Sequence, residues 1–285
     1  MTAIASDWHI HSQNSCDSAS LIMTDLLTDA ATAGISDFGV TDHIHTPFNL
    51  PDLQRSRQEF LALDPPPFFH FGVEVSSVSQ WEIEEIARGG HDNPVYGIRS
   101  GGPAGAPLAI GLGEEELAAC GVEYVVGGTH WPIYVPLERE TVIRDYHRQN
   151  LFLATHPLVD VVAHPWWWHG AWQDGQGNFK GEPWFDDFGR IPAAMHDEFA
   201  AAAREHGKRL EINLAALLLN PHYPERFKEQ YCEYLAELQE TGVCLSIGSD
   251  CHDQRYQIDF DTAAAMLARA GVHGEELWVL PCRQP

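Results

Sequence analysis

The chain has 285 residues, of which 44% are hydrophobic, and it carries a formal net charge of −24 with only 17 lysines and arginines. A chain of this length can bury a full hydrophobic core, and none of its apolar runs approaches the length of a membrane span. Because nucleic-acid binding needs a basic surface, the acidic composition argues against a nucleic-acid partner.

The six cysteines show no C-x-x-C spacing, and the N-terminus has no basic segment followed by a long apolar run. These two features predict reduced thiols and a cytoplasmic protein without a secretory signal.

The first predicted strand, residues 3–11, ends in the pattern His9-Ile10-His11. In a strand, residues i and i+2 point to the same face, so His9 and His11 can bind one metal ion together. Paired surface histidines are common, and the pattern is a weak signal by itself. Cys16 and Cys251 stand beside other candidate ligands, and the same alternation favours their neighbours over the thiols.

Five later apolar runs also end on residues that can bind a metal ion. These residues are His43 after 38–42, Glu74 after 69–73, His130 after 124–129, His164 after 159–163, and Asp250 and His252 after 243–249. In a (β/α) barrel the active site lies at the carboxyl ends of the strands. The series therefore predicts an α/β barrel with a metal site at its C-terminal face.

Helices are predicted between the strands, as such a barrel requires. The first spans 24–33, with Thr24 as its N-cap and Gly34 as its stop. Further helices are expected at 51–63, 76–87, 138–153, 191–206, 224–240 and 260–270, and a first helical turn at 114–116. Further strands are expected at 209–213 and 276–281, and loop insertions at about 89–113 and 166–190.

Three interpretations of side chains follow from this placement. Glu82, Glu84 and Glu85 are expected on a solvated helix face, and His147 is expected on the surface. His45 is expected to support a neighbouring ligand or to line the pocket, because a Thr-Pro step redirects the chain directly after it.

Three consecutive tryptophans, Trp166, Trp167 and Trp168, open the second insertion. They cannot all face one core, so they either pack as a lid on the barrel mouth or form an aromatic wall for a substrate. Trp167 and Trp168 are therefore candidate substrate-binding residues. Arg255 is a third candidate because of its position close to the last ligand run. Trp131, Trp172, Lys180 and Arg190 are further residues expected near the mouth.

Taken in order, the motifs H-x-H, Asp17, T-D-H, G-V-E, G-x-H, A-H-P and G-S-D-x-H resemble the PHP family (polymerase and histidinol phosphatase domain) over essentially the whole chain. The resemblance implies one domain over residues 1–285, a distorted seven-stranded TIM-like barrel, and two to three divalent ions (Zn, Mn or Fe). It implies nine metal ligands: His9, His11, Asp17, His43, Glu74, His130, His164, Asp250 and His252.

The resemblance also implies a metal-dependent hydrolase, most simply a phosphoesterase that attacks a small-molecule phosphoester with a metal-bridging hydroxide. Glu74, Asp250 and His252 are the expected catalytic residues, with Glu74 bridging two ions. Histidinol phosphatases of the family place a basic residue after an E-x-N segment, whereas this chain has an apolar run at 214–219. Three alternatives stay open: a histidinol-phosphate phosphatase, a lactone or amide hydrolase of amidohydrolase type, and a catalytically idle metal-binding module.

Overall fold

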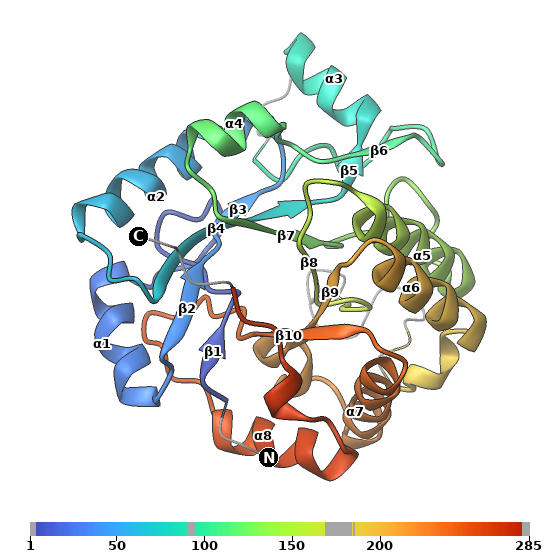
Figure 1. The fold of residues 1–285 in the computed structure, drawn as a ribbon. Helices are drawn as coiled ribbons and strands as arrows, with labels where there is room; N and C mark the ends of the chain where they lie inside the picture. Colours follow the sequence, from blue (N-terminus) through green and yellow to red (C-terminus); the bar gives the residue numbers. More distant parts are fainter. Residues whose placement is uncertain (1–3, 90–94, 169–183, 185, 281–285) are drawn as a thin grey trace.

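The computed structural model describes residues 4–89, 95–168, 184 and 186–280. Within these residues, eight short strands form one sheet around a central axis (Figure 1). They are β1 (Ser6–Asp7), β2 (Asp37–Val40), β3 (His43–Ile44), β4 (Phe69–Ser76), β7 (Tyr124–Gly128), β8 (Val161–Ala163), β9 (Arg209–Asn213) and β10 (Cys244–Gly248).

The sheet is parallel throughout and runs in the order β1-β2-β4-β7-β8-β9-β10, with β3 continuing the line of β2 beside β4. Its two edges meet, because the amide of Trp8 donates to Ile247 O at 2.9 Å and Ile10 pairs with Cys251. Seven strand positions thus form a nearly closed barrel, and the predicted distorted (β/α) barrel is confirmed.

Helices lie outside the barrel, between successive strands (Figure 1). They are α1 (Met23–Ala33), α2 (Leu50–Ala62), α3 (Gln80–Arg88), α4 (Glu114–Ala119), α5 (Arg139–Thr155), α6 (Ala193–Glu205), α7 (Glu225–Glu240) and α8 (Phe260–Ala270). The insertion at about 89–113 is not entirely loop, because β6 (Leu108–Ala109) within it pairs antiparallel with β5 (Val78–Ser79), which lies directly before α3.

Helix α1 begins at Met23, so the predicted N-cap at Thr24 is wrong. The amide of Leu26 donates to Ile22 O at 3.0 Å, and no side chain caps this end. Met23 is fully buried, and its packing places the helix start one residue earlier. The predicted stop at Gly34 is confirmed, since it adopts a φ of 78° in the left-handed region that favours glycine.

Residues 277–280 do not form the predicted last strand. The amide of Trp278 donates to Leu245 O at 2.7 Å, and its ring lies 5.3 Å from that of Trp8 and 6.1 Å from that of Tyr124. One backbone hydrogen bond and aromatic packing at the amino ends of β7 and β10 therefore take the place of a strand pairing.

Two side chains expected on the surface are buried instead. Glu82 is 1% exposed, whereas Glu84 lies on the exposed side of α3 as expected. His147 is 7% exposed and its Nε2 lies 2.8 Å from the Glu198 carboxylate, because α6 packs on α5. The helical period of each segment does not reveal which neighbour covers its polar face.

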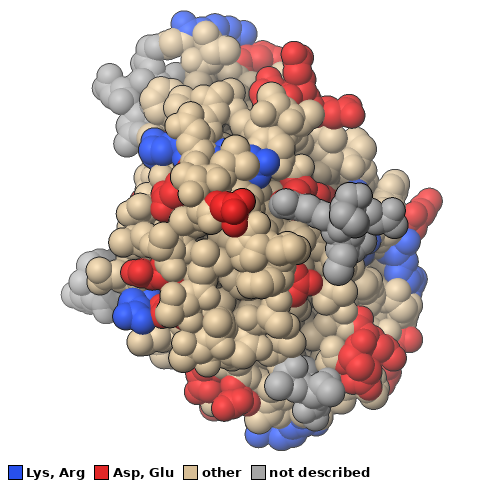
Figure 2. All heavy atoms as spheres, turned by 60° about the vertical axis from the view of Figure 1, so that its left-hand side comes forward, with Lys and Arg blue, Asp and Glu red and all other residues tan. Residues whose placement is uncertain are grey.

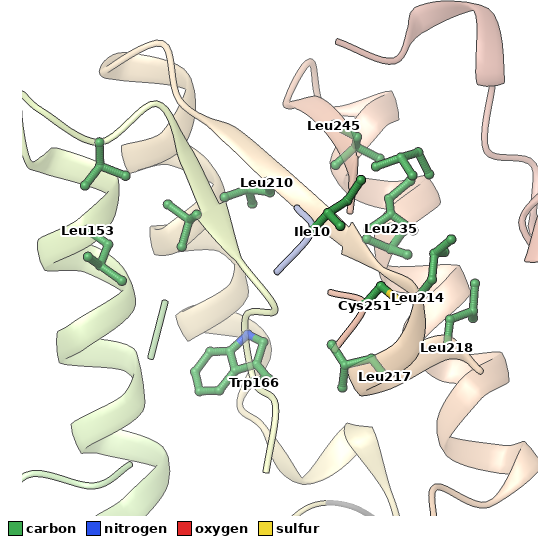
Figure 3. Close-up of a cluster of buried hydrophobic side chains, with 14 of the residues drawn as sticks. Ile10, Leu153, Trp166, Leu210, Leu214, Leu217, Leu218, Leu235, Leu245 and Cys251 are labelled. Atoms are coloured by element: carbon green, nitrogen blue, oxygen red, sulfur yellow. The ribbon is translucent and has the colours of Figure 1, made fainter. Parts of the chain in front are cut away.

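The main core lies between the barrel and the surrounding helices. Figure 3 shows Leu153 of α5, Leu210 of β9, Leu235 of α7 and Leu245 of β10 in this layer. The π-helical segment Leu214–Leu218, directly after β9, adds three leucines to it. The carboxyl ends of the strands are thereby fixed from outside by apolar packing.

The molecular surface reflects the acidic composition. On the face drawn in Figure 2, Asp and Glu side chains gather in several separate groups, and the described Lys and Arg side chains form no continuous stripe. Among the described residues, no helix combines the length and the apolar character needed to cross a bilayer.

Candidate metal centre

The paired histidines after β1 lie side by side, as the strand alternation predicts. His9 and His11 are 1% and 0% exposed, and their Nε2 atoms are 3.0 Å apart. The intervening Ile10 points into the core, where it meets Cys251 of the last strand end (Figure 3). Two imidazoles therefore face the barrel mouth from one short extended segment.

Glu74, near the end of β4, is the centre of the cluster and is completely buried. Its Oε2 lies 2.7 Å from His43 Nδ1, 3.1 Å from His9 Nε2 and 3.4 Å from His11 Nε2. Its Oε1 lies 2.9 Å from His164 Nε2 and 3.2 Å from His130 Nε2. One carboxylate thus meets five imidazoles delivered by four segments of the chain.

A glycine on the adjacent strand makes this approach possible. A Cβ atom at Gly128 of β7 would lie 2.5 Å from Glu74 Oε1 and 2.6 Å from His130 Cε1. Any side chain there would overlap both groups, so glycine at position 128 is required by the crowding of the site.

The remaining predicted ligands form the side of the cluster nearest the first loop. His252 Nε2 lies 2.7 Å from Asp17 Oδ2, which is also 3.5 Å from His43 Nε2. Asp250 Oδ1 lies 3.2 Å from His11 Nε2. The structure therefore brings all nine predicted ligands into one connected cluster.

Four overlapping groups of three residues have donor atoms close enough to hold a metal ion. They are His11-His43-His252, His9-His11-Glu74, His9-His164-Asp250 and His43-Glu74-His130. Eight of the nine predicted ligands belong to these groups, and Asp17 adjoins them through His252.

The donor atoms themselves fit a cation. His43 Nδ1, Glu74 Oε2 and His130 Nε2 are buried without a hydrogen-bond partner in the described structure, although each lies close to others of the group. A buried polar atom without a partner costs about 1–3 kcal/mol, and a shared metal ion satisfies several at once. The residues present therefore fit bound divalent metal.

The protonation states of Glu74 and His130 favour metal binding, whereas His252, whose pKa despite burial is raised to about 9 chiefly by its hydrogen bond to Asp17, must release a proton on binding metal. Burial raises the pKa of Glu74, but the surrounding imidazoles, His43 foremost, hold it well below its ordinary value. Burial lowers the pKa of His130 to about 3, so this imidazole is neutral at pH 7. Ionised carboxylates and neutral imidazoles are the forms that bind metal.

Glu211 on β9 was not among the predicted site residues, yet it holds two of them in place. Its Oε1 lies 2.6 Å from His9 Nδ1, and its Oε2 accepts from the amide of His164 at 2.6 Å and from Asn213 Nδ2 at 2.9 Å. Asn213 also donates to Asp250 Oδ2 at 3.2 Å. The E-x-N spacing on a strand, which puts both side chains on one face, was the available signal.

Glu211→Gln is expected to weaken metal affinity by about 10–100-fold, because the carboxylate orients His9 and increases its basicity. A titration of metal into the stripped protein measures the effect. Glu123→Gln is a matched control, since Glu123 accepts from His70 Nδ1 at 3.0 Å at the start of β4, away from the cluster. Equal affinities in Glu211→Gln and the wild type would contradict this role.

A cavity of about 340 Å³ opens over the cluster. Besides the candidate ligands, its lining includes Tyr96, Trp131, Trp167, Ala215 and Asn220. His45 lines it too, as expected, and its Nδ1 lies 2.7 Å from Ser76 Oγ, which is 2.9 Å from His130 Nδ1. His45 thus supports a candidate ligand through Ser76 and also faces the cavity.

Only part of the predicted aromatic wall is present at this cavity. Trp167 lines it, with its ring 5.0 Å from that of His164. Trp168 does not: it is 2% exposed, its amide donates to Tyr223 OH at 2.8 Å, and its ring packs on Trp184. Trp166 is also in the core (Figure 3). The substrate-binding role expected for Trp168 is therefore corrected to a packing role.

Arg255 is also displaced from its expected role. Its guanidinium forms a two-pronged pair with the Asp29 carboxylate of α1, at 2.8 and 2.6 Å, and it does not line the cavity. Arg190 lies 3.8 Å from Asp187 outside the cavity lining, and Trp172 and Lys180 lie outside the described residues. Acidic partners close in sequence or on a neighbouring helix hold these arginines on the surface.

The apolar run after β9 presents two faces. Leu214, Leu217 and Leu218 are fully buried in the core, whereas Ala215 and Ala216 line the cavity. The side of the cavity where a basic residue was expected therefore carries methyl groups, not leucine side chains.

The same fold occurs among solved structures. Histidinol phosphate phosphatase from Lactococcus lactis subsp. lactis Il1403, solved with Zn, L-histidinol and phosphate, matches with a TM-score of 0.61 and 18% identity over 97% of each chain. A weaker match is a Xaa-Pro dipeptidase with bound methionine, with a TM-score of 0.37 and 10% identity over 94% of this chain and 70% of that chain. Another is a citrate lyase from Burkholderia xenovorans LB400, with a TM-score of 0.43 and 9% identity over 95% of this chain and 78% of that chain.

No family model matches the chain, and no curated protein matches its sequence. The structural match at 18% identity covers nearly all of both chains and therefore shows a shared fold. The chain has the fold of a histidinol phosphate phosphatase, which is the PHP-type barrel that its motifs resemble.

Proposed function

We propose that this chain is a metal-dependent phosphoesterase that acts on a small-molecule phosphoester. The observation that carries the proposal is the cluster around buried Glu74, where eight predicted ligands form overlapping groups at the floor of a cavity. A catalytically idle module has no need of a cavity directly over its ligands. The Lactococcus phosphatase, with Zn in a barrel of the same fold, supports the reaction class.

Nine residues would hold the ions: His9, His11, Asp17, His43, Glu74, His130, His164, Asp250 and His252. When bound, divalent ions lower the pKa of a coordinated water and polarise the scissile phosphoryl group. The chain supplies charge balance, because Asp17, Glu74 and Asp250 together carry three negative charges against six from three divalent ions. The cavity of this acidic protein would therefore attract a phosphate group.

The residues above the ions would bind and shield the rest of the substrate. Trp131, Trp167 and Tyr96 give the cavity aromatic sides, and Ala215 leaves room beside them. Apolar groups bind such a surface better than a hydrated sugar does. We therefore propose that the leaving group is aromatic or otherwise apolar.

Histidinol-phosphate hydrolysis is the second candidate, favoured by the fold match. Against it, Ala215 and Ala216 line the cavity in the segment where histidinol phosphatases of the PHP family carry a basic residue. Metal analysis of the purified chain, followed by a panel of aryl and alkyl phosphomonoesters, phosphodiesters, histidinol phosphate and lactones, tests the proposal. Turnover of lactones alone would replace the phosphoesterase with an amidohydrolase-type activity.

Aryl phosphoesters are expected to be hydrolysed with a higher kcat/KM than histidinol phosphate, by about 5–150-fold. Burial of one further aromatic ring is worth about 1–3 kcal/mol in discrimination. Trp167→Ala should raise KM for the aryl ester and barely change it for a small alkyl phosphate.

Trp168→Phe is the matched control for this prediction. Trp168, the next residue on the chain, packs in the core, so this substitution should lower the melting temperature and leave the ratio of aryl to alkyl kcat/KM unchanged. The aromatic-leaving-group proposal fails when histidinol phosphate exceeds every aryl ester and Trp167→Ala makes no difference.

A further inference from the structure

An ion pair between the buried carboxylate of Glu82 and the partly exposed guanidinium of Arg99 lies behind the aromatic side of the cavity, outside the metal cluster. Glu82 of α3 is 1% exposed, and its Oε1 accepts from Arg99 Nη2 at 3.1 Å. The same carboxylate accepts from the amide of Ile98, and Tyr134 OH donates to its Oε2 at 3.4 Å. None of these residues is a candidate metal ligand.

Water is excluded from the carboxylate end of the pair, whereas 33% of the Arg99 side chain is exposed. Burial raises the pKa of Glu82 and lowers that of Arg99 to about 10. The chain approaches the carboxylate at Gly97, which has a φ of 74° and where a Cβ would overlap both Glu82 and Arg99. A buried carboxylate costs stability unless it is paired, and the partners of Glu82 are Arg99, the amide of Ile98 and Tyr134 OH.

The guanidinium of Arg99 lies directly over the ring of Trp131, with its central carbon 3.4 Å from the ring centroid. This is a close cation–π stack. Trp131 in turn lines the cavity, and its ring lies 5.1 Å from that of His45 and 5.4 Å from that of His130.

The backbone of Trp131 is held independently of this stack. Its carbonyl accepts from Gln149 Nε2 of α5 at 3.0 Å. The Trp131 ring has no hydrogen-bond partner at Nε1 in the described structure. The orientation of the ring therefore depends on packing, and the guanidinium plane is the flat surface against which it packs.

We infer that Glu82 and Arg99 are positioning residues that fix the Trp131 ring as the specificity wall for an aromatic group on the substrate. The inference rests on the proposed function and extends it to residues that do not touch the substrate. Glu82 fixes the plane of the guanidinium, the guanidinium fixes the indole, and the indole presents its surface to the cavity. The segment before β6 thereby contributes to specificity without supplying a ligand.

Binding of phenylphosphonate and methylphosphonate to the metal-loaded protein, measured by calorimetry, tests this inference without turnover. Arg99→Lys keeps the charge but loses the planar stack, and Glu82→Gln/Arg99→Met removes both charges and keeps an apolar stem on the ring. Both variants should lose about tenfold in affinity for phenylphosphonate and less than about twofold for methylphosphonate.

Matched controls stand on the exposed side of the same helix. Glu84→Gln and Arg88→Lys disrupt a surface pair with a 3.5 Å separation, and both should keep wild-type affinities for the two ligands. Trp131→Leu should lose the same factor for phenylphosphonate as Arg99→Lys. The double variant Arg99→Lys/Trp131→Leu should lose no more affinity for phenylphosphonate than either single variant, because both substitutions act through the Trp131 ring.

An unchanged affinity ratio in both Arg99 variants would overturn the inference and leave the pair as an anchor of its segment. Equal losses for both ligands would also overturn it, since the pair would then support the metal cluster and not the wall. A wild-type protein that binds neither phosphonate would overturn the proposed function, and the inference with it.

Discussion

Replacement of Glu74 by glutamine is expected to remove metal from two sites and to reduce turnover by about a thousandfold or more. The carboxylate oxygens lie within 3.4 Å of five imidazole nitrogens, and Glu74 belongs to two of the four candidate metal groups. Glutamine keeps the size of the side chain but removes the charge that offsets two cations, and it places an amide N–H₂ where only acceptors fit.

The fold is expected to survive this change, because the barrel packs through the apolar layer outside the strands and not through the cluster. Metal content by elemental analysis, kcat for an aryl phosphoester and the melting temperature separate the three effects. Glu123→Gln is again the control, at a partly exposed carboxylate paired with a histidine, and it should keep full metal content and rate. Full metal content and rate in Glu74→Gln would show that Glu74 is not a bridge.

Two to three divalent ions are expected per chain, and chelation should remove them together with all activity. The four candidate groups share His9, His11, His43 and Glu74, so they cannot each hold an ion independently. Eight residues at three to four ligands per ion suffice for two ions, and Asp17 as a ninth ligand makes three possible. A metal ion that binds the folded state and not the unfolded state stabilises the folded state. The melting temperature should therefore fall on chelation.

This prediction is tested by elemental analysis of the chain before and after treatment with a chelator. The stripped chain is then reloaded with Zn, Mn or Fe. Activity should return with the metal, and the metal that restores the highest kcat/KM identifies the preferred ion. A chain that binds one ion or none after full supplementation would contradict a two- or three-metal centre.

The barrel and the order of its ligands could be predicted from the sequence, because both depend on local patterns. Each apolar run is short enough to be one buried strand, and each ends on a side chain that can bind metal. Parallel strands in one barrel have their carboxyl ends at one face. His9, His11 and Glu74 therefore meet although 62 residues lie between His11 and Glu74.

Residues whose role depends on a distant neighbour could not be predicted in this way. Glu82 looks like its exposed neighbours along α3, and only the return of the chain to Arg99 makes it a buried partner. Glu211 occupies an ordinary strand position in the sequence, and its role comes from contacts with His9 and His164, which follow two other strands. Burial of a charge is decided by the tertiary partner that offsets its desolvation, and no local period reports that partner.

The run Trp166-Trp167-Trp168 also separates what the sequence predicts from what the tertiary structure decides. The sequence by itself determined that three adjacent rings could not share one environment. Only the tertiary structure decided that Trp167 faces the cavity while Trp166 and Trp168 enter the core. The loop has no repeating period, and its side chains are distributed by the space left between α5, α6 and the barrel mouth. The side chains at strand ends could be placed from the local sequence pattern, because the strand geometry fixes their direction. The environment of each loop side chain depends on the space that the packed helices and strands leave, which the local sequence does not specify.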